Sequence, residues 1–567
     1  MNSTANDIQR LLAAGRTADA EGALRSKLAQ VPSNVEWRTL LARVLVATGR
    51  KAEAIAELGL VVEHAPSARD ARLTLARLAN ELGQSELAAR HARVLTERDA
   101  RDSEAWSALG MAAFGRRNKR EAARALRRAV EIDPAYGAAR YNLSAVLTDQ
   151  EQSEEALEHA AAALKAGAKP RSVSLVQARA LVQLDRLEDA ERQLLGLLQA
   201  DAGDVEAHGL LVQLRQLRGD EEPLAAMRTA AQASSATPRL RLAFADSARR
   251  AGATIESEAI LRELMNTFGP EPMLLSSLTT VLQESGRTSE ALDAARASIA
   301  RLPDEAVVAE NFVVAALCAG ASPEALPVVE KFRARKPLDQ RWITYRLDIA
   351  RLRAEEEFAS WFDPARVVTI VDLPPPPGFA TPAEFLSALV PVLQSRHRQQ
   401  NHPLDQSLRH GTQTSRNLLV KPGAEILALL QSFREALADM QAHSGSDTAH
   451  PFTARNVSPA EIIGCWSVRL RRGGFHVNHI HPEGWVSSAY YASVPDEVDD
   501  STVRSGWLKF GEPRFAVPGL GPFLEVQPRA GRLVLFPSYL WHGTHALRGD
   551  EPRMSVPFDA VPQAELG

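Results

Sequence analysis

The 567-residue sequence is poor in the features that mark several large classes of protein. It has only two cysteines, Cys318 and Cys465, which excludes a disulfide framework and fits a reducing compartment. No run of about 18 apolar residues occurs, which excludes a membrane-spanning helix. The first residues, MNSTANDIQRLLAAGR, lack the basic start and apolar stretch of a secretory signal. These features predict a cytoplasmic protein without membrane contact.

The net charge, the composition and the length of the chain indicate which partners and which fold to expect. The 66 lysine and arginine residues against 70 aspartate and glutamate residues give a net charge of −4, so no basic excess indicates nucleic acid as a partner. Aromatic residues are 5% of the chain and apolar residues 45%, which indicates helices rich in alanine, leucine and valine. Because domains usually have about 100–200 residues, we expect more than one domain.

Small residues recur with a period of 34 in the first three-fifths of the chain. One column consists of alanine except for Leu224, and its spacing departs slightly from 34 after that residue: Ala20, Ala54, Ala88, Ala122, Ala156, Ala190, Leu224, Ala259, Ala291 and Ala325. Five residues earlier runs a column rich in glycine: Gly15, Gly49, Gly83, Arg117, Glu151, Asp185, Gly219, Thr254, Gly286 and Gly320. A third column is small at Ala42, Ala76, Gly110, Ser144 and Ala178. Proline follows the alanine column at Pro32, Pro66, Pro134, Pro303 and Pro337.

These columns predict stacked pairs of antiparallel helices. Small residues allow two helices to approach closely, glycine or a polar residue forms the turn, and proline ends the second helix. One pair cannot bury its apolar face alone, so the pairs must stack into a solenoid. The pattern resembles the tetratricopeptide repeat over residues 5–350, about ten helix pairs, and matches it best at Trp106–Pro134. The resemblance implies a groove that binds a protein or peptide, with a spacer or dimerisation element as the alternative.

A different pattern begins after Pro337. Residues 366–373 are rich in β-branched side chains and precede a proline-rich loop at 374–377. Helices are expected at 382–396 and about 423–442. From residue 461 onward, short apolar runs separated by glycine and proline predict several strands in a β-sandwich or small barrel.

Histidines gather in this C-terminal region although the chain has only 14. In the segment GFHVNHIHP, His479 and His481 would point to the same side if the backbone is extended, because side chains alternate along a strand. Two such imidazoles with a third from a distant strand commonly hold one metal ion. His542, just after the apolar segment 532–537, is the candidate for the third ligand.

Eleven residues after His542, Arg553 and Ser555 lie on another apolar segment. A buried arginine beside a metal needs an anion, because an uncompensated charge is costly there. Its guanidinium can bind a carboxylate with two hydrogen bonds, and Ser555, on the same face, can add another.

The order His-x-His, Tyr490-Tyr491, distal His and Arg-x-Ser resembles the 2-oxoglutarate/Fe(II)-dependent oxygenases. The match is closest to those fused behind tetratricopeptide repeats, where blocks such as Ser407-Leu408-Arg409 and HIHPEGW recur. The resemblance covers residues 360–563 and implies an α+β multidomain chain, in which an α-solenoid precedes a double-stranded β-helix (jelly-roll) domain with flanking helices. It places the metal ligands at His479, His481 and His542, and the residues that bind the co-substrate at Arg553, Ser555 and Tyr491.

One departure from that family concerns the ligands. The usual motif has two histidines and one carboxylate, whereas this sequence offers three histidines, with Glu483 as the rival ligand if His481 comes first. We favour the three histidines because Pro482 makes a regular strand through Glu483 doubtful. His476 is expected beside the ligands or facing substrate.

The resemblance implies an enzyme that uses Fe(II), 2-oxoglutarate and O2, whose repeats recruit a protein or other large substrate. Because the usual aspartate is absent, a non-catalytic repeat scaffold with a degenerate metal-binding or ligand-binding domain is the alternative. A cupin-like enzyme that does not use 2-oxoglutarate is a third.

Overall fold

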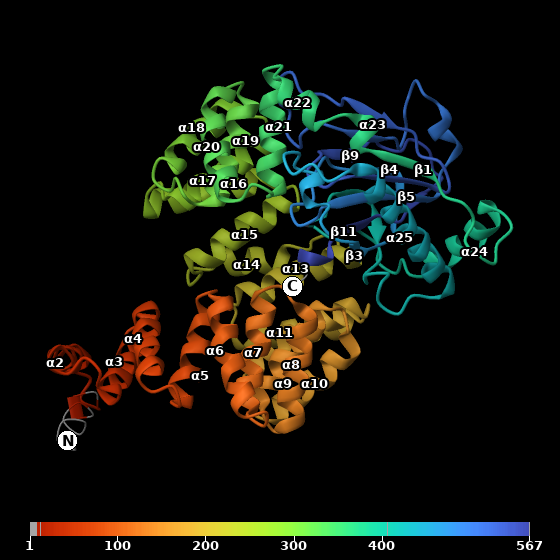
Figure 1. Ribbon diagram of the computed structural model, residues 1–567. Helices are drawn as coiled ribbons and strands as arrows, with labels where there is room; N and C mark the ends of the chain where they lie inside the picture. Colours follow the sequence, from red (N-terminus) through yellow and green to blue (C-terminus); the bar gives the residue numbers. More distant parts are fainter. Residues whose placement is uncertain (1–7, 9, 12, 405, 566–567) are drawn as a thin grey trace. The chain divides into compact units, whose positions relative to one another are not determined.

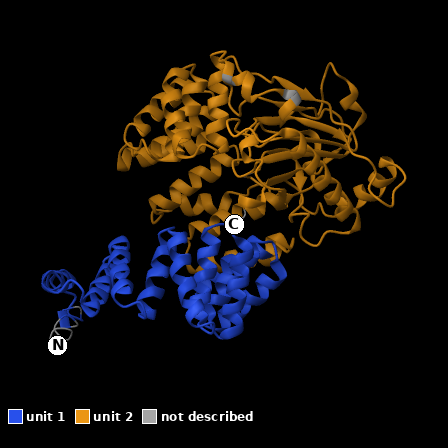
Figure 2. Ribbon diagram, viewed as in Figure 1, with its two compact units in different colours: residues 1–180, 567 blue, residues 181–566 orange. Residues whose placement is uncertain are grey.

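The computed structural model describes residues 8, 10–11, 13–404 and 406–565 (Figure 1). The chain divides into two compact units, residues 1–180 with 567, and residues 181–566 (Figure 2). The first unit is helical, and in the second a run of helices precedes antiparallel sheets. Within the described ranges, no helix is long and apolar enough to cross a membrane.

The repeat helices of the first unit follow the 34-residue columns. They are α2 (Thr17–Gln30), α3 (Val35–Ala47), α4 (Lys51–His64), α5 (Arg69–Glu81), α6 (Ser85–Arg98), α7 (Ser103–Gly115), α8 (Lys119–Ile132), α9 (Gly137–Asp149), α10 (Ser153–Lys165) and the start of α11 (Pro170–Gln183). The alanine column is fully buried, with 0% exposure from Ala20 to Ala156 at each repeat. The glycine-rich column has positive φ throughout this unit, including 63° at Arg117 and 56° at Glu151. These residues therefore form the left-handed turns between paired helices.

The second unit continues the same pattern in the end of α11 and ten further helices of its described residues. They are the end of α11, α12 (Leu187–Ala200), α13 (Val205–Arg218), α14 (Ala225–Gln232), α15 (Pro238–Arg250), α16 (Thr254–Phe268), α17 (Pro272–Glu284), α18 (Thr288–Ile299), α19 (Ala306–Cys318), α20 (Ser322–Arg335) and α21 (Gln340–Leu352).

One expected repeat position in this unit is wrong. Thr254 begins α16, and the left-handed residue is Gly252, with φ of 85°. Ala259 is exposed, and the buried small residue five positions after Gly252 is Ser257, 1% exposed. The register shifts by two residues here because the residue without a Cβ takes the left-handed conformation most readily.

The sheets lie in the C-terminal part of this unit. Their strands are β1 (Thr369–Asp372), β2 (Leu408–Gln413), β3 (Ala460–Cys465), β4 (Val468–His476), β5 (Val486–Ser493), β6 (Leu508–Phe510), β7 (Leu524–Val526), β8 (Arg532–Pro537), β9 (His542–Thr544), β10 (Arg553–Ser555) and β11 (Phe558–Pro562). The larger sheet has the order β1-β8-β5-β10-β4-β2, with β11 paired to β3 and β5, and the smaller sheet has the order β7-β6-β9. The antiparallel sheet region is thus confirmed, while its description as a jelly roll stays a prediction.

Four helices accompany the sheets: α22 (Glu356–Trp361), α23 (Pro364–Val367), α24 (Pro382–Gln394) and α25 (Ala424–Ser444). Of these, α24 contacts β5 and α25 contacts β3 of the larger sheet. Short 3-10 turns lie at Thr453–Arg455, Asp496–Asp499 and Gln563–Glu565. The two helices expected here, α24 and α25, are confirmed. Phe433 of α25 contacts Tyr490 and Phe558, with ring centroids 5.3 and 4.6 Å apart. Tyr490 is therefore a packing residue of the core.

Candidate metal centre

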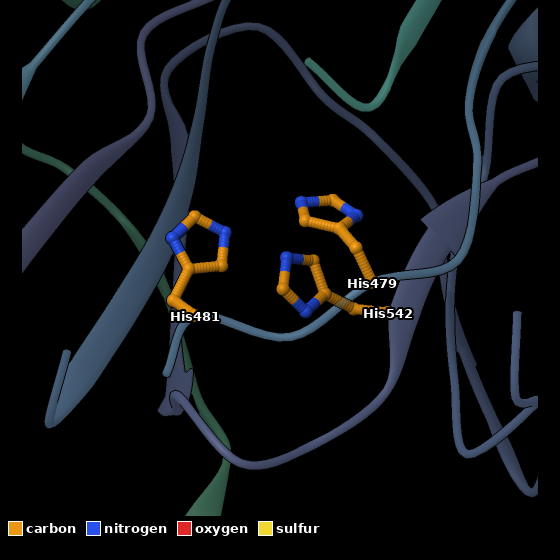
Figure 3. A group of neighbouring side chains, drawn as sticks. All are labelled: His479, His481 and His542. Atoms are coloured by element: carbon orange, nitrogen blue, oxygen red, sulfur yellow. The ribbon is translucent and has the colours of Figure 1, made fainter. Parts of the chain in front are cut away.

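His479, His481 and His542 come together at one place in the second unit. Their candidate ligand atoms all lie within 4.8 Å of one another. The ring centroids of His479 and His542 are 4.2 Å apart, and that of His481 is 5.1 Å from each. Figure 3 shows the three imidazoles around a shared space. Residues separated by some sixty positions therefore form one group of nitrogen donors.

Backbone pairing outside the main strands brings these histidines together. β4 ends at His476, so the segment that carries His479 and His481 follows that strand instead of continuing it. His479 and His542 exchange two backbone hydrogen bonds, of 2.9 and 3.0 Å. The amide of His481 donates to the carbonyl of Ser538 over 3.0 Å. The segment is thereby fixed against the loop between β8 and β9.

Two glycines allow this close approach. A Cβ on Gly543 would lie 2.1 Å from Oδ1 of Asn478, and a Cβ on Gly484 would lie 2.4 Å from Oγ of Ser538. Both distances are shorter than van der Waals contact, so a side chain at either position would push the histidine segment away from the β8–β9 loop.

The hydrogen bonds of the three rings leave one nitrogen of each available. Nδ1 of His479 lies 2.8 Å from the carbonyl of Val477, and Nδ1 of His542 lies 3.0 Å from that of Leu540. Nδ1 of His481 lies 2.7 Å from Oδ2 of Asp559. Because these acceptors need a proton on Nδ1, each neutral ring presents the lone pair of Nε2, which is the form that binds a metal.

Asp559 is a site residue that the sequence analysis missed. Its Oδ1 accepts a 2.7 Å hydrogen bond from Ser487, whose hydroxyl lies 2.9 Å from that of Ser538. Burial acts to lower the pKa of His481, but the charge and hydrogen bond of Asp559 outweigh it, so this pKa is raised. Burial and the neighbouring His481 instead lower the pKa of His479 to about 3. Asp559 therefore distinguishes one histidine electrostatically from the other two.

Arg553 is buried without a carboxylate partner in the described residues. It is 2% exposed, one nitrogen donates to the carbonyl of Gly506, and its Nε has no partner. Burial lowers its pKa. The guanidinium lies over the ring of Tyr491 at 5.5 Å, and the buried hydroxyl of Tyr491 also has no hydrogen-bond partner. An unpaired buried cation beside an unpaired hydroxyl fits an anionic group such as a carboxylate.

The other expected site residues occupy different positions. Ser555 is buried on β10 and pairs with Tyr491 across to β5. Glu483 is exposed and lies outside the histidine group. The ring of His476 is 6.1 Å from that of His479, and its Nδ1 lies 2.9 Å from the hydroxyl of Ser407.

A cavity of about 470 Å³ opens beside the histidines. His479 and Trp541 line it together with residues of the repeat helices α15, α16, α17, α19 and α21. The other tryptophan left undecided by the sequence, Trp485, is 1% exposed and packs against Phe452 in the core. Residues of the last repeat helices therefore form a wall of the space next to the candidate metal centre.

Helix α21 also holds the loop that carries His542. Thr344 donates to the carbonyl of Tyr539 over 2.6 Å, and Nε1 of Trp541 donates to Oδ2 of Asp348 over 2.9 Å. Arg351 donates to the carbonyls of Gly511 and Gly521 over 2.8 and 2.7 Å. The three α21 side chains share one helix face because they are three or four residues apart. No periodic signal in the sequence indicated that α21 would have this second role.

Comparison with known families agrees with this division of the chain. Residues 464–559 match the family described as "Putative 2OG-Fe(II) oxygenase". Residues 11–69 and 103–136 match families described as tetratricopeptide repeats. The chain thus combines tetratricopeptide repeats with a 2OG-Fe(II) oxygenase-type domain. No curated protein matches the chain.

Solved structures resemble parts of the chain at low identity. MamA from Desulfovibrio magneticus RS-1 is 19% identical over 29% of this chain and 93% of its own, with a TM-score of 0.27. PilF of Pseudomonas aeruginosa is 16% identical over 37% of this chain and 95% of its own, with a TM-score of 0.32. A tetratricopeptide-repeat protein of Thermus thermophilus is 20% identical over 31% of this chain and 95% of its own, with a TM-score of 0.28.

Proposed function

We propose that the chain is an Fe(II)- and 2-oxoglutarate-dependent oxygenase, with His479, His481 and His542 as metal ligands. The observation that carries the proposal is the group of three imidazoles, each fixed through Nδ1, in the same domain as a buried Arg553 that has no anionic partner within residues 13–404 and 406–565. The family match at residues 464–559 supports the same reaction class.

Each residue has a definable role in this proposal. The three Nε2 atoms would hold Fe(II), and Asp559 keeps the ring of His481 oriented. Arg553, Tyr491 and Ser555 would bind the far carboxylate of 2-oxoglutarate, which gives the buried guanidinium its counter-ion. When bound, the iron and 2-oxoglutarate supply the O2-dependent oxidation of a substrate, with succinate and CO2 as co-products. Three neutral ligands leave the site more positive than a set with one carboxylate, which favours an anionic co-substrate.

The repeats and the domain limits complete the proposal. Repeat helices at residues 5–350 would bind a protein or peptide, because solenoids present extended concave surfaces, and the oxygenase domain would span 360–563. Cys318 and Cys465 are both buried and free, which is compatible with the proposed cytoplasmic location.

Binding of the metal and co-substrate tests the proposal without knowledge of the substrate. Under anaerobic conditions the full chain should bind one Fe(II), and added 2-oxoglutarate should produce a visible metal-to-ligand absorption band. His481→Ala and His542→Ala should lose both signals. Succinate release in air above that of His542→Ala then reports turnover. Iron binding that is unaffected by 2-oxoglutarate would contradict the proposal and favour the cupin-like alternative. If the chain binds no stoichiometric iron, the non-catalytic repeat scaffold is the remaining alternative.

A further inference from the structure

The carboxylates in and around the cavity beside His479 are of two kinds, and those of the first kind are already paired with arginines. Arg249 pairs with Asp246 over 3.0 Å and with Glu284 over 2.7 Å, and Arg514 pairs with Glu284 over 3.3 Å. Arg250 also pairs with Asp246, over 2.9 Å, so three arginines surround two carboxylates at this side of the cavity. Both carboxylates of this cluster are therefore already paired and offer no free charge to a cationic ligand.

Two further carboxylates in the cavity wall are not balanced in this way. Asp348 is 5% exposed, receives its hydrogen bond from the indole of Trp541, and forms no ion pair among the described residues. Arg351, one turn along α21, donates to two backbone carbonyls instead. Glu310 accepts a 2.9 Å hydrogen bond from Tyr345, and its ion-pair distance to Arg341 is a long 3.9 Å. Burial raises the pKa of both carboxyl groups.

Aromatic rings accompany these two carboxylates. Tyr345 and Trp541 both line the cavity, and their ring centroids are 6.4 Å apart. Aromatic faces combined with carboxylates attract alkylammonium and guanidinium groups through cation–π and ionic interactions. Trp541 directly precedes the proposed ligand His542, so a group bound here would lie next to the metal centre.

Buried polar atoms without partners also line the cavity. Nε2 of Gln283 and Oγ of Ser257 have no hydrogen-bond partner in the part of the chain that the structure describes, although these residues are only 7% and 1% exposed. Both atoms can donate a hydrogen bond, so they fit acceptors such as the peptide carbonyls of a bound chain. The volume of about 470 Å³ lies within the usual range for a ligand site, about 300–1,000 Å³.

We propose that this cavity binds a lysyl or arginyl side chain of a polypeptide substrate, with Asp348 and Glu310 facing its charge and Trp541 and Tyr345 flanking it. The inference rests on the proposed oxygenase function for what happens to the side chain, but not for its binding. It assigns the last repeats a direct part in selecting the residue that reaches the metal, in addition to any contact with the rest of the partner.

Binding of matched peptides to the full chain, without iron or 2-oxoglutarate, tests this inference. The probes are acetylated and amidated pentapeptides Ala-Ala-Xaa-Ala-Ala, where Xaa is lysine, arginine, norleucine or glutamate, measured by calorimetry. We expect a lysine or arginine peptide to bind at least about tenfold more tightly than the norleucine peptide. Asp348→Asn and Glu310→Gln should each weaken that binding about tenfold. Asp246→Asn is the matched control in the same cavity and should leave binding within about twofold, because Arg249 and Arg250 already pair with this acid.

The possible outcomes separate the parts of the inference. Three results would each overturn the inference. The norleucine peptide could bind as tightly as the lysine and arginine peptides, or folded Asp348→Asn and Glu310→Gln could bind the cationic peptides as tightly as the wild type. The third is that no cationic peptide binds at about 1 mM. N-acetyl-lysinamide bound as tightly as the lysine peptide overturns the polypeptide part. Far-ultraviolet circular dichroism checks that each variant is folded. His481→Ala should lose Fe(II) and keep peptide binding, whereas Glu310→Gln should do the reverse, so the failure of this inference is distinct from that of the proposed function.

Discussion

The carboxylate of Asp559 lies 2.7 Å from Nδ1 of His481, so an acid on β11 orients one of the three proposed metal ligands. The same carboxylate binds Ser487 of β5, a strand that pairs with β11. The orientation of His481 therefore depends on the register between two strands of the larger sheet.

Removing this acid should weaken metal binding. Asp559→Ala is expected to lower the Fe(II) affinity of the full chain about 10–100-fold, because the hydrogen-bond partner of a ligating histidine fixes its ring and raises its basicity. Asp559→Asn should lower the Fe(II) affinity less than Asp559→Ala does, since an amide oxygen still accepts a hydrogen bond from Nδ1 of His481. Anaerobic Fe(II) titration measures both. Asp550→Ala, at an exposed position, is the control, and unchanged affinity in Asp559→Ala would argue against the assigned ligand role of His481.

Arg553 should be needed for 2-oxoglutarate and not for folding. In Arg553→Met, 2-oxoglutarate binding should weaken by about 2 kcal/mol or more while Fe(II) binding is retained. Without 2-oxoglutarate the variant should be as stable as the wild type or more so, because an unpaired buried charge has been removed. Thermal unfolding with and without 2-oxoglutarate measures both effects. Unimpaired 2-oxoglutarate binding in the variant would exclude Arg553 as the anchor.

The buried Asp348 should make stability depend on pH. Burial raises its pKa to about 7, so the folded chain holds this proton where the unfolded chain, at about 3.9, has lost it. This contribution is complete below about pH 4 and disappears as pH rises toward 7, by up to roughly 1.4 kcal/mol per pH unit. Denaturant unfolding across this range should show the decline in the wild type and a flatter profile in Asp348→Asn.

Asp372 provides a control of opposite sign. Its hydrogen bond with Arg532 lowers its pKa, so its contribution is present above the ordinary aspartate pKa and is lost as pH falls. Asp372→Asn should therefore lose stability at neutral pH and approach the wild type in acid. A wild-type profile identical to that of Asp348→Asn would contradict the assigned proton on Asp348.

Two helical glycines of the first unit should respond oppositely to alanine. A Cβ on Gly110 would lie 2.6 Å from Cγ of Leu126 and 3.1 Å from the carbonyl of Ala122, so Gly110→Ala should destabilise by about 1–3 kcal/mol. A Cβ on Gly59 meets nothing within 4 Å, so Gly59→Ala should stabilise by about 0.5–1 kcal/mol. Thermal unfolding of each full-length variant is the measurement, and equal shifts would show that helix spacing at Gly110 is not tight.

The repeats were predictable because their spacing constraint is local and recurs. Small residues at fixed intervals identified the buried column, and φ at Arg117 and Glu151 is positive even without glycine. The register shift at Gly252 escaped detection because Thr254 and Ala259 also fit the columns by residue type.

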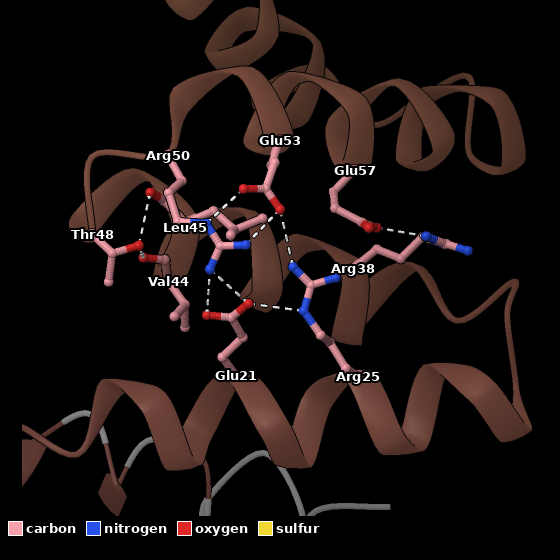
Figure 4. Close-up of polar contacts among 9 residues, drawn as sticks. All are labelled: Glu21, Arg25, Arg38, Val44, Leu45, Thr48, Arg50, Glu53 and Glu57. Atoms are coloured by element: carbon pink, nitrogen blue, oxygen red, sulfur yellow. Dashed lines mark hydrogen bonds and ion pairs between the residues drawn. The ribbon is translucent and has the colours of Figure 1, made fainter.

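Recurrence extends to side-chain ion pairs that the sequence analysis did not find. Figure 4 shows Glu21, Arg25, Arg50 and Glu53 in one network between adjacent helices. The same four-residue arrangement occurs in the second unit: Glu258, Arg262, Arg287 and Glu290. Such charges vary in type along the repeats, so no column of identical letters reveals them.

The site was only partly predictable. The histidines and Arg553 belong to a recognisable order of motifs, and the structure brings the three histidines together as expected. Asp559 and Asp348 have no such motif, because their roles arise from strand register and from a helix about 190 residues away from Trp541. Contacts between distant segments depend on the completed fold, so no periodic pattern in the sequence indicates them.

Helix α21 has a practical consequence for dividing this protein. By sequence it closes the repeat array, yet Thr344, Asp348 and Arg351 hold the segments around Trp541, Gly511 and Gly521. A fragment starting at residue 360 would thus expose the underside of the loop that presents His542. A chimera that joins the C-terminal domain to another repeat array would have to retain Gln340–Leu352, because this last repeat helix is a structural part of both modules.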